Sequence, residues 1–337
     1  MKTLACFVFG TALCWCAVLG ADEAHLQDQE LVKKILQLPK NHITRLSPDF
    51  DEIVAGKDLR RLLLDNWRVP EPQDRVRLLL ILREEVLRSE GIWRVYDVEL
   101  ARALVDALDD ENMDVRHFAA ESLNRYFDLT LIRFFSDAIL TSVRKNPSSD
   151  GILLAGKTGS KEAVELLTQD MFRNWMDKKP VELALAKLGD HKLEAKFVDE
   201  FAKCQDERKV ADDLAYIGTM DACRAIAAEL RSPVIIGVPW RQSSIRVFLI
   251  ESLSHAFPGE KVLRPPNGPI DDTYYEAIEK WATAVLGVTW DVPRPKFFYA
   301  FVGPSPREAD ESQRNGPLPL PATPLRRTEK LKKQNVM

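Results

Sequence analysis

Residues 151–158 read G-I-L-L-A-G-K-T and match the P-loop pattern G-x-x-x-x-G-K-[ST] at every fixed position. In a P-loop, the backbone N–H groups of a loop that follows a β-strand hold the phosphates, and small residues let the phosphates approach. Here the polar stretch "SVRKNPSSD" precedes Gly151, and the variable positions are Ile-Leu-Leu-Ala. Bulky apolar side chains would occupy the phosphate site, so the surroundings argue against nucleotide binding.

The same stretch has the features of a short helix. Ser148 or Ser149 is placed to cap its N-terminus, residues 152–155 are apolar, and Gly159 is suited to end it. An acidic partner for a nucleotide-bound metal would be sought at Glu251, after the apolar run "VFLI", but that run fits an amphipathic helix equally well. We therefore interpret the P-loop match as coincidental and predict a helix.

A second apparent motif combines S-x-x-K at residues 142–145 with K-T-G at residues 157–159, two signatures of β-lactamases. In that family the second signature lies on a strand far along the chain, and a third lies between them. Here the two lie close together within a helical pattern, so we interpret them as noise.

Metal-binding patterns are also missing from the sequence. The histidines show neither H-x-x-x-H nor H-E-x-x-H spacing; they are His25, His42, His117, His191 and His255. The acidic runs at residues 109–111 and 271–272 stand at helix starts, where carboxylates interact favourably with the helix dipole, and they lack the ligand spacing of a calcium loop. We predict no catalytic, cofactor-binding or metal-binding residue.

An internal repeat carries more information than these motifs. Three segments align on Gly159, Gly189 and Gly218, spaced 30 and 29 residues apart. Apolar residues lie four positions before each glycine and four, eight and twelve positions after it; they are Ala155, Leu185 and Leu214 before, and Ala163, Leu167, Met171, Leu193, Phe197, Phe201, Ala222, Ile226 and Leu230 after. Spacing by four keeps side chains on one helix face. The pattern predicts helix pairs that turn at the glycine, where positive φ is allowed.

A fourth copy lies upstream, with Phe127 in the position of the glycine and 32 residues before Gly159. The matching apolar residues are Leu123, Leu131, Phe135 and Ile139. Further helices are predicted within residues 28–38, 55–66, 73–89, 98–108, 243–257 and 271–287, each from its apolar periodicity.

The segments "LAYIGTMDACRAIAAEL" and "LAKLGDHKLEAKFVDEF" resemble HEAT-like repeats of the short bihelical kind also seen in phycobilisome-lyase proteins. The segment "DDENMDVRHFAAESLNRY" resembles them too, because residues 114–116 look like the start of a HEAT second helix. The resemblance covers about residues 95–232. It implies an all-α fold in which stacked, armadillo-like helix pairs form an α-solenoid, or αα-superhelix. Such repeats identify a fold well and a function poorly.

The expected organisation is an N-terminal helical region over residues 21–94, a repeat solenoid over 95–291, an extended segment over 292–303 and a Pro-rich, basic, disordered tail over 304–337. The stretch "SPVIIGVPWRQ" interrupts the solenoid at about 232–242, because Gly218 and the next plausible repeat glycine, Gly259, are 41 residues apart. We expect an extended loop here, either packed on the helices or used for binding.

The N-terminus predicts export. Lys2 is followed by the apolar run "LACFVFGTALCWCAVL" and then by "GADEA", which is typical of a signal peptide cleaved after Gly20. An uncleaved anchor is the alternative, but the run is shorter than the ~20 residues that span a bilayer. We therefore expect a secreted or periplasmic protein with no membrane span after cleavage.

Cleavage leaves two cysteines, Cys204 and Cys223. In an oxidising compartment these two are able to form a disulfide, and they are 19 residues apart, about the step between neighbouring repeat helices. The alternative is that both are buried small residues, since free cysteine is among the most buried types. The sequence leaves both alternatives open.

The charge distribution limits the class of partner. Residues 21–302 carry 39 Lys and Arg against 47 Asp and Glu, while residues 303–337 carry 7 against 4. An acidic body argues against nucleic acid, which binds clustered positive charge. The sequence thus favours a non-catalytic scaffold that binds a protein partner through a solenoid surface. The alternatives are a lyase-like or accessory repeat protein acting on an envelope polymer or cofactor, and a self-assembling envelope component.

Overall fold

The computed structural model describes residues 26–38, 48–90, 95–204, 207–232, 235–238, 241–264 and 271–294. The predicted signal peptide, the basic tail and most of the segment 292–303 lie outside these residues. Within them, no helix is both long enough and apolar enough to cross a membrane.

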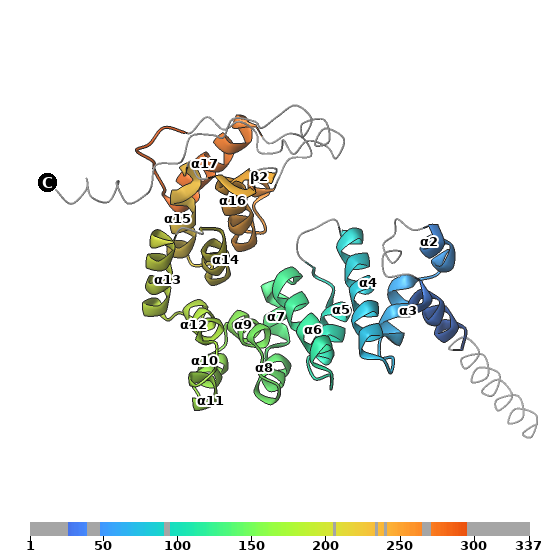
Figure 1. The fold of residues 1–337 in the computed structure, drawn as a ribbon. Helices are drawn as coiled ribbons and strands as arrows, with labels where there is room; N and C mark the ends of the chain where they lie inside the picture. The colour runs from blue at the N-terminus through green and yellow to red at the C-terminus, as the bar shows by residue number, and fades with distance from the viewer. Residues whose placement is uncertain are drawn as a thin grey trace, which may run out of the picture. The chain divides into compact units, whose positions relative to one another are not determined.

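Regular structure in the described residues is helical except for one β-hairpin, which confirms the predicted all-α class (Figure 1). A first helix spans residues 26–37. The others are α2 (Pro48–Val54), α3 (Leu59–Asn66), α4 (Pro72–Glu90), α5 (Val98–Ala107), α6 (Met113–Tyr126), α7 (Leu129–Phe134), α8 (Ser136–Lys145), α9 (Ser149–Thr158), α10 (Lys161–Leu167), α11 (Asp170–Arg173), α12 (Lys178–Lys187), α13 (His191–Lys203), α14 (Glu207–Ile217), α15 (Met220–Ala228), α16 (Ile245–Ala256) and α17 (Asp272–Leu286), with short 3-10 turns at Glu229–Arg231 and Lys261–Leu263.

The chain divides into two compact units, with the boundary between Ala184 and Leu185 in α12. In the first unit, α4, α6 and α9 are successive neighbours in one layer of helices. The other layer contains α3 beside α5 and α8 beside α10. Contacts of α5 with α6 and of α8 with α9 join the layers. Their buried interface is the apolar core of the unit and includes Leu100, Leu104, Ala119 and Ile139.

The chain turns at the three repeat glycines, as predicted. Gly159, Gly189 and Gly218 have φ values of 67°, 105° and 69°, the left-handed region that favours glycine. The next residue in each case is the N-cap of the second helix: Ser160, Asp190 and Thr219 accept backbone N–H bonds from that helix's first turn. The glycine and the cap form the whole connection between α9 and α10 and between α14 and α15, and Leu188 precedes them between α12 and α13.

In the fourth copy, the backbone between the two helices has a different conformation. Phe127 is buried and has an extended backbone, with φ −95° and ψ 147°, and it pairs with Val95 in a single parallel bridge. Extended backbone needs no glycine, which explains the bulky residue at this position. The helix that we expected to continue from Leu131 to Ile139 is broken at Phe135, between α7 and α8.

Most of the predicted apolar stripe is buried. The exceptions are Leu185, Leu193 and Phe135, which are half-buried, and Met171, whose side chain is 44% exposed. The prediction for Met171 was wrong because α10 ends at Leu167 and a new helix, α11, begins at Asp170. The change of helix turns Met171 outward and places Phe172 in the core instead.

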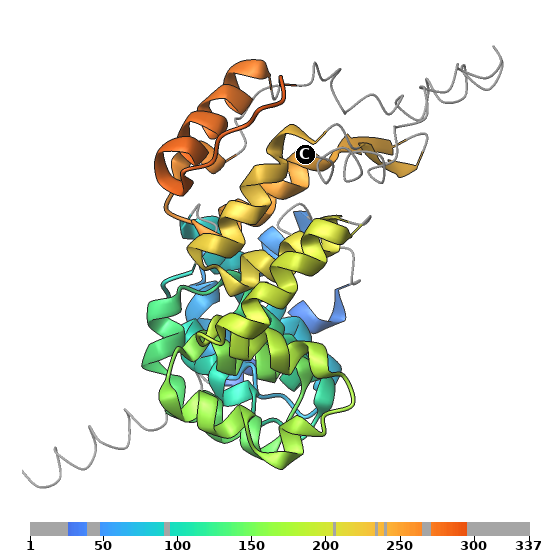
Figure 2. The same ribbon diagram turned by 90° about the vertical axis from the view of Figure 1, so that its left-hand side faces the viewer.

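The inserted stretch also differs from the expectation of a loop. Strands β1 (Ile235–Val238) and β2 (Arg241–Ser244) pair antiparallel, with Ile235 opposite Ser244 and Val238 opposite Arg241. The hairpin (gold arrows in Figure 2) leads directly into α16, whose N-cap is Ser244. Apolar and β-branched residues in the first strand favour this pairing, a signal that the two prolines obscured in the sequence.

The second unit also has two sets of neighbouring helices, α14 beside α16, and α13 beside α15 beside α17. Hydrogen bonds hold the C-terminal segment after α17 against the region where α15 ends. Trp290 donates its indole N–H to the Ala228 carbonyl at 3.1 Å, and Arg231 donates to the Val292 carbonyl at 2.6 Å. Residues 287–294 therefore lie against the end of α15.

Candidate functional site

The P-loop pattern lies in helix α9. Ser148 caps the helix by accepting the Gly151 N–H at 3.1 Å, and Gly159 ends it, as predicted. Gly151, Gly156 and Thr158 are buried, and the Thr158 hydroxyl donates to the Ala155 carbonyl at 2.7 Å. A P-loop needs backbone N–H groups that point into a loop. Here these groups belong to a helix packed in the core, so the pattern forms no phosphate cradle.

The side chain of Lys157 is hydrogen-bonded to the neighbouring helix, α6. Its Nζ donates to the Asn124 carbonyl in the last turns of α6, and the Asn124 side chain donates to the Asp150 carbonyl at 2.8 Å. Lys187, in the same register of the next pair, donates to the carbonyls of Tyr216 and Ile217 at 2.7 and 3.2 Å. Both lysines therefore bind carbonyl groups near the C-terminus of a parallel neighbour, where a cation stabilises a helix end.

We expect Lys157→Ala to leave ATP binding at background and to lower the free energy of unfolding by about 1 kcal/mol, because it removes a cation from a helix C-terminus. Isothermal titration with Mg-ATP and urea unfolding of the full chain measure the two effects. Lys161→Ala is the control, since this lysine is exposed and its ion pair with Glu165 lies within α10. Micromolar ATP binding that depends on Lys157 would contradict the helix interpretation.

The other apparent motif residues also have structural roles. The Ser142 hydroxyl is buried in α8 and donates to the Leu108 carbonyl at 2.8 Å, at the end of α5. His117 contacts the Asp150 carboxylate at 2.7 Å, and His191 contacts that of Glu194 at 3.2 Å. His25 and His42 lie outside the described residues. Among the residues that the structure describes, no cluster of His, Cys, Asp and Glu is arranged to hold a metal.

Cys204 and Cys223 do not form a disulfide in the structure. Cys204 follows α13 and is half-buried, whereas Cys223 is fully buried in α15. Burial raises the pKa of the Cys223 thiol to about 12, so this sulfur is a poor nucleophile at neutral pH. The burial of Cys223 fits the second alternative that the sequence left open, whereas Cys204 is only half-buried.

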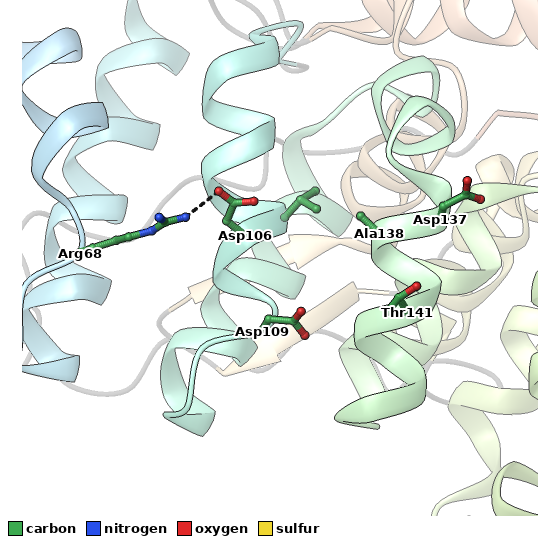
Figure 3. Close-up of a pocket in the computed structure, with 7 residues that line it drawn as sticks. Arg68, Asp106, Asp109, Asp137, Ala138 and Thr141 are labelled. Atoms are coloured by element: carbon green, nitrogen blue, oxygen red, sulfur yellow. Dashed lines mark hydrogen bonds and ion pairs between the residues drawn. The ribbon is translucent and has the colours of Figure 1, made fainter.

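A concave feature with several polar groups lies in the first unit, between α5 and α8 (Figure 3). It is a shallow hollow of about 450 Å³ lined by Arg68, Val105, Asp106, Asp109, Asp137, Ala138 and Thr141. Arg68 donates to the Asp106 carboxylate at 2.7 Å across one side, and Asp109, Asp137 and Thr141 surround the other. The hollow thus brings three carboxylates and one guanidinium to an open surface.

Sequence reasoning missed this hollow. The helices that form it are adjacent only because the fold places α8 beside α5, and the aspartates look like ordinary surface residues when read along the chain. The usable signal was helical spacing, because Asp106 and Asp109 are three residues apart, and Asp137 and Thr141 are four apart. Asp137 and Thr141 share a face of α8, and Asp109 lies in the turn just after α5, but nothing in the sequence states that these surfaces meet.

Comparison of the chain with models of protein families, with curated proteins and with solved structures gave no match. The resemblance to HEAT-like repeats therefore remains a prediction from the residues.

Proposed function

We propose that this protein is an exported, non-catalytic scaffold whose helix pairs are HEAT-like repeats that present a solenoid surface to a protein partner. The observation that carries the proposal is the recurrence of one connection, a left-handed glycine followed by an N-cap residue, at Gly159, Gly189 and Gly218. Repeats joined in the same way stack in the same way, because each pair buries its apolar faces only against its neighbours.

Contacts between equivalent helices support the repeat. His117 contacts Asp150, and Lys157 contacts Asn124 with the same separation of 33 residues, so α6 and α9 run parallel in constant register. In the second unit, Ser252 donates to Asp212 at 2.8 Å and joins α16 to α14 with a separation of 40 residues. This separation is longer than the one between α6 and α9 because the β-hairpin is inserted between α14 and α16. An insertion that leaves the stacking intact is typical of a solenoid.

The absence of catalysis is inferred from how the polar groups are used. An enzyme needs polar groups that converge in an enclosed pocket, whereas a scaffold needs only a broad surface. The hydroxyl, lysine and histidine side chains of the sequence motifs each bond a helix end or a neighbouring carboxylate. The polar hollow between α5 and α8 is open and shallow, and we take it as part of a contact surface.

Affinity capture of the mature chain, residues 21–337, from an envelope extract tests the proposal. We expect one protein partner in stoichiometric amount, retained after chemical cross-linking and missing from a control with heat-denatured bait. Turnover of a small molecule or envelope polymer, with no captured protein, would contradict the scaffold and favour the lyase-like alternative.

A further inference from the structure

The outer surface between α5 and α8, called the groove below, differs along its length. Ser142 bonds the Leu108 carbonyl where both helices end, and Arg102 lies over the Phe135 ring at 6.0 Å near the start of α8. The two helices therefore run in the same direction. The polar hollow occupies the part nearer their C-terminal ends, and apolar residues lie at the other end.

The apolar end exposes large side chains. Phe134 is 68% exposed, Tyr96 is 57% exposed, and Val98 lies one turn before Arg102 on the exposed face of α5 with 44% exposure. Phe134 contacts Phe135 edge to face, with ring centroids 4.9 Å apart, so its ring is held on the surface by packing. Phe135 in turn lies beside Arg102 of α5, so the Phe134 ring provides exposed apolar surface near this end of the groove.

The polar end carries an excess of negative charge. Arg68 neutralises Asp106, and Lys145 lies 3.9 Å from Asp109. Asp137 has no hydrogen bond or ion pair with any residue that the structure describes. Asp137 is one of the residues that line the hollow, and it lies in the first turn of α8 (Figure 3). A cationic side chain placed in the hollow would be attracted by the charge of Asp137 and, in part, by that of Asp109.

We propose that this groove, defined by Val98, Phe134, Asp137, Thr141, Asp106 and Asp109, binds a short basic segment of a partner protein. An aromatic or aliphatic side chain of the segment packs on Phe134 and Val98, and a lysine or arginine a few residues away lies over Asp137 and Asp109. The inference rests on the proposed scaffold function and names the chemistry of its partner. An apolar anchor beside exposed charges gives an interaction whose affinity depends on the ring and whose association rate falls with salt.

Fluorescence anisotropy of the full mature chain with labelled 12-residue peptides tests the groove. The probe contains four lysines or arginines and one leucine; one control peptide replaces the basic residues by glutamate, and another replaces the leucine by serine. We expect micromolar binding of the probe at 50 mM salt, at least tenfold weaker binding at 300 mM, and no measurable binding of either control.

Two exposed substitutions locate the site without disturbing the core. Asp137→Lys and Phe134→Ser are each expected to weaken probe binding by about tenfold, about 1.4 kcal/mol. Glu165→Lys, an equally exposed acid on α10, is the matched control and is expected to leave binding unchanged. Circular dichroism melting of each variant verifies folding. Equal binding of the acidic peptide, or probe binding that neither groove variant alters, would overturn the proposal.

The same variants separate this inference from the scaffold function. If wild-type protein captures a partner from the extract and Asp137→Lys captures it equally well, the scaffold stands and the groove is wrong. If wild-type protein captures none, the scaffold function itself fails.

Discussion

Replacing Glu279 by alanine is expected to lower the free energy of unfolding of the second unit by about 3 kcal/mol at pH 7. The Glu279 side chain in α17 is buried and accepts hydrogen bonds from two arginines. Arg231 donates at 2.8 Å from the 3-10 turn after α15, and Arg294 donates at 3.0 Å from the C-terminal segment. Removing the carboxylate leaves these two cations close together with no buried anion between them.

A third arginine makes the loss larger. Arg246 in α16 is buried, with its guanidinium 4.5 Å from the centroid of the Tyr275 ring. Burial lowers the pKa of Arg246, and the negative charge of Glu279 is among those that oppose this shift. Glu279 thus balances positive charge from three elements, and we expect its removal to open α17 and the segment that follows it.

The effect depends on pH in a defined direction. Burial by itself would raise the pKa of Glu279, but hydrogen bonds from Arg294 and Arg231 outweigh it and hold this pKa below the ordinary value of 4.5. A group whose pKa is lower in the folded state stabilises the fold above its unfolded pKa. The contribution of Glu279 is therefore complete near pH 7 and decreases as the pH falls below about 4.5.

Urea unfolding of wild-type and Glu279→Ala chains at pH 7 and pH 3.5 measures both effects. We expect the difference between the two proteins to be large at pH 7 and clearly smaller at pH 3.5. Glu276→Gln is the matched control, because Glu276 bonds Arg294 from a half-exposed position on the same helix and should cost under about 1 kcal/mol. A difference that is equal at the two pH values would show that Glu279 acts through packing and not through its charge.

Local signals account for the parts of the fold that the sequence predicted well. The turns at Gly159, Gly189 and Gly218 depend on one flexible residue and one cap, and both can be recognised from a few neighbouring letters. The short helix α9 was predictable for the same reason, because Ser148 and Gly159 mark its two ends. Apolar spacing by four then fixed most of the buried face.

Non-local contacts account for what was missed. The break at Phe135 and the exposed Phe134 depend on how α7 and α8 fit against α5, which no local pattern encodes. The Glu279 cluster joins residues 48 positions apart, and its arginines look like ordinary surface charges in the sequence. The polar hollow between α5 and α8 was missed for the same reason, because non-local contacts bring these two helices together. Periodicity identifies the face of a helix that is buried, but it does not identify which helix covers that face.

The first unit contains a comparable charged contact at the start of α5, and Asp97→Ala is expected to destabilise this unit by about 2–3 kcal/mol. Asp97 has two functions. Its Oδ1 accepts the Leu100 N–H at 2.9 Å as the N-cap of α5, a contact whose removal costs about 1 kcal/mol. Its two oxygens also accept bonds from Arg60 in α3 at 2.8 and 3.0 Å. This bidentate pair joins two helices of the same layer.

A second substitution separates the cap from the ion pair. Asparagine is as good an N-cap as aspartate, so Asp97→Asn keeps the bond to Leu100 and loses the charge opposite Arg60. We expect it to cost about half as much as Asp97→Ala. Glu99→Gln is the control, because Glu99 also bonds Arg60 but is half-exposed, and its loss should cost a few tenths of a kcal/mol.

Hydrogen exchange of the full chain shows where stability is lost. Both Asp97 variants should increase exchange of α5 amides, with a larger increase for alanine, and we expect α13–α17 to keep their protection. Burial raises the pKa of Asp97, but bonds from Arg60 and from backbone N–H groups outweigh burial and lower it below the ordinary value of 3.8. The cost of Asp97→Asn should therefore shrink as the pH falls below about 3.8. If alanine and asparagine cost the same, the cap at Leu100 contributes nothing, and α5 is held in place by Arg60 and by the burial of Leu100 and Leu104.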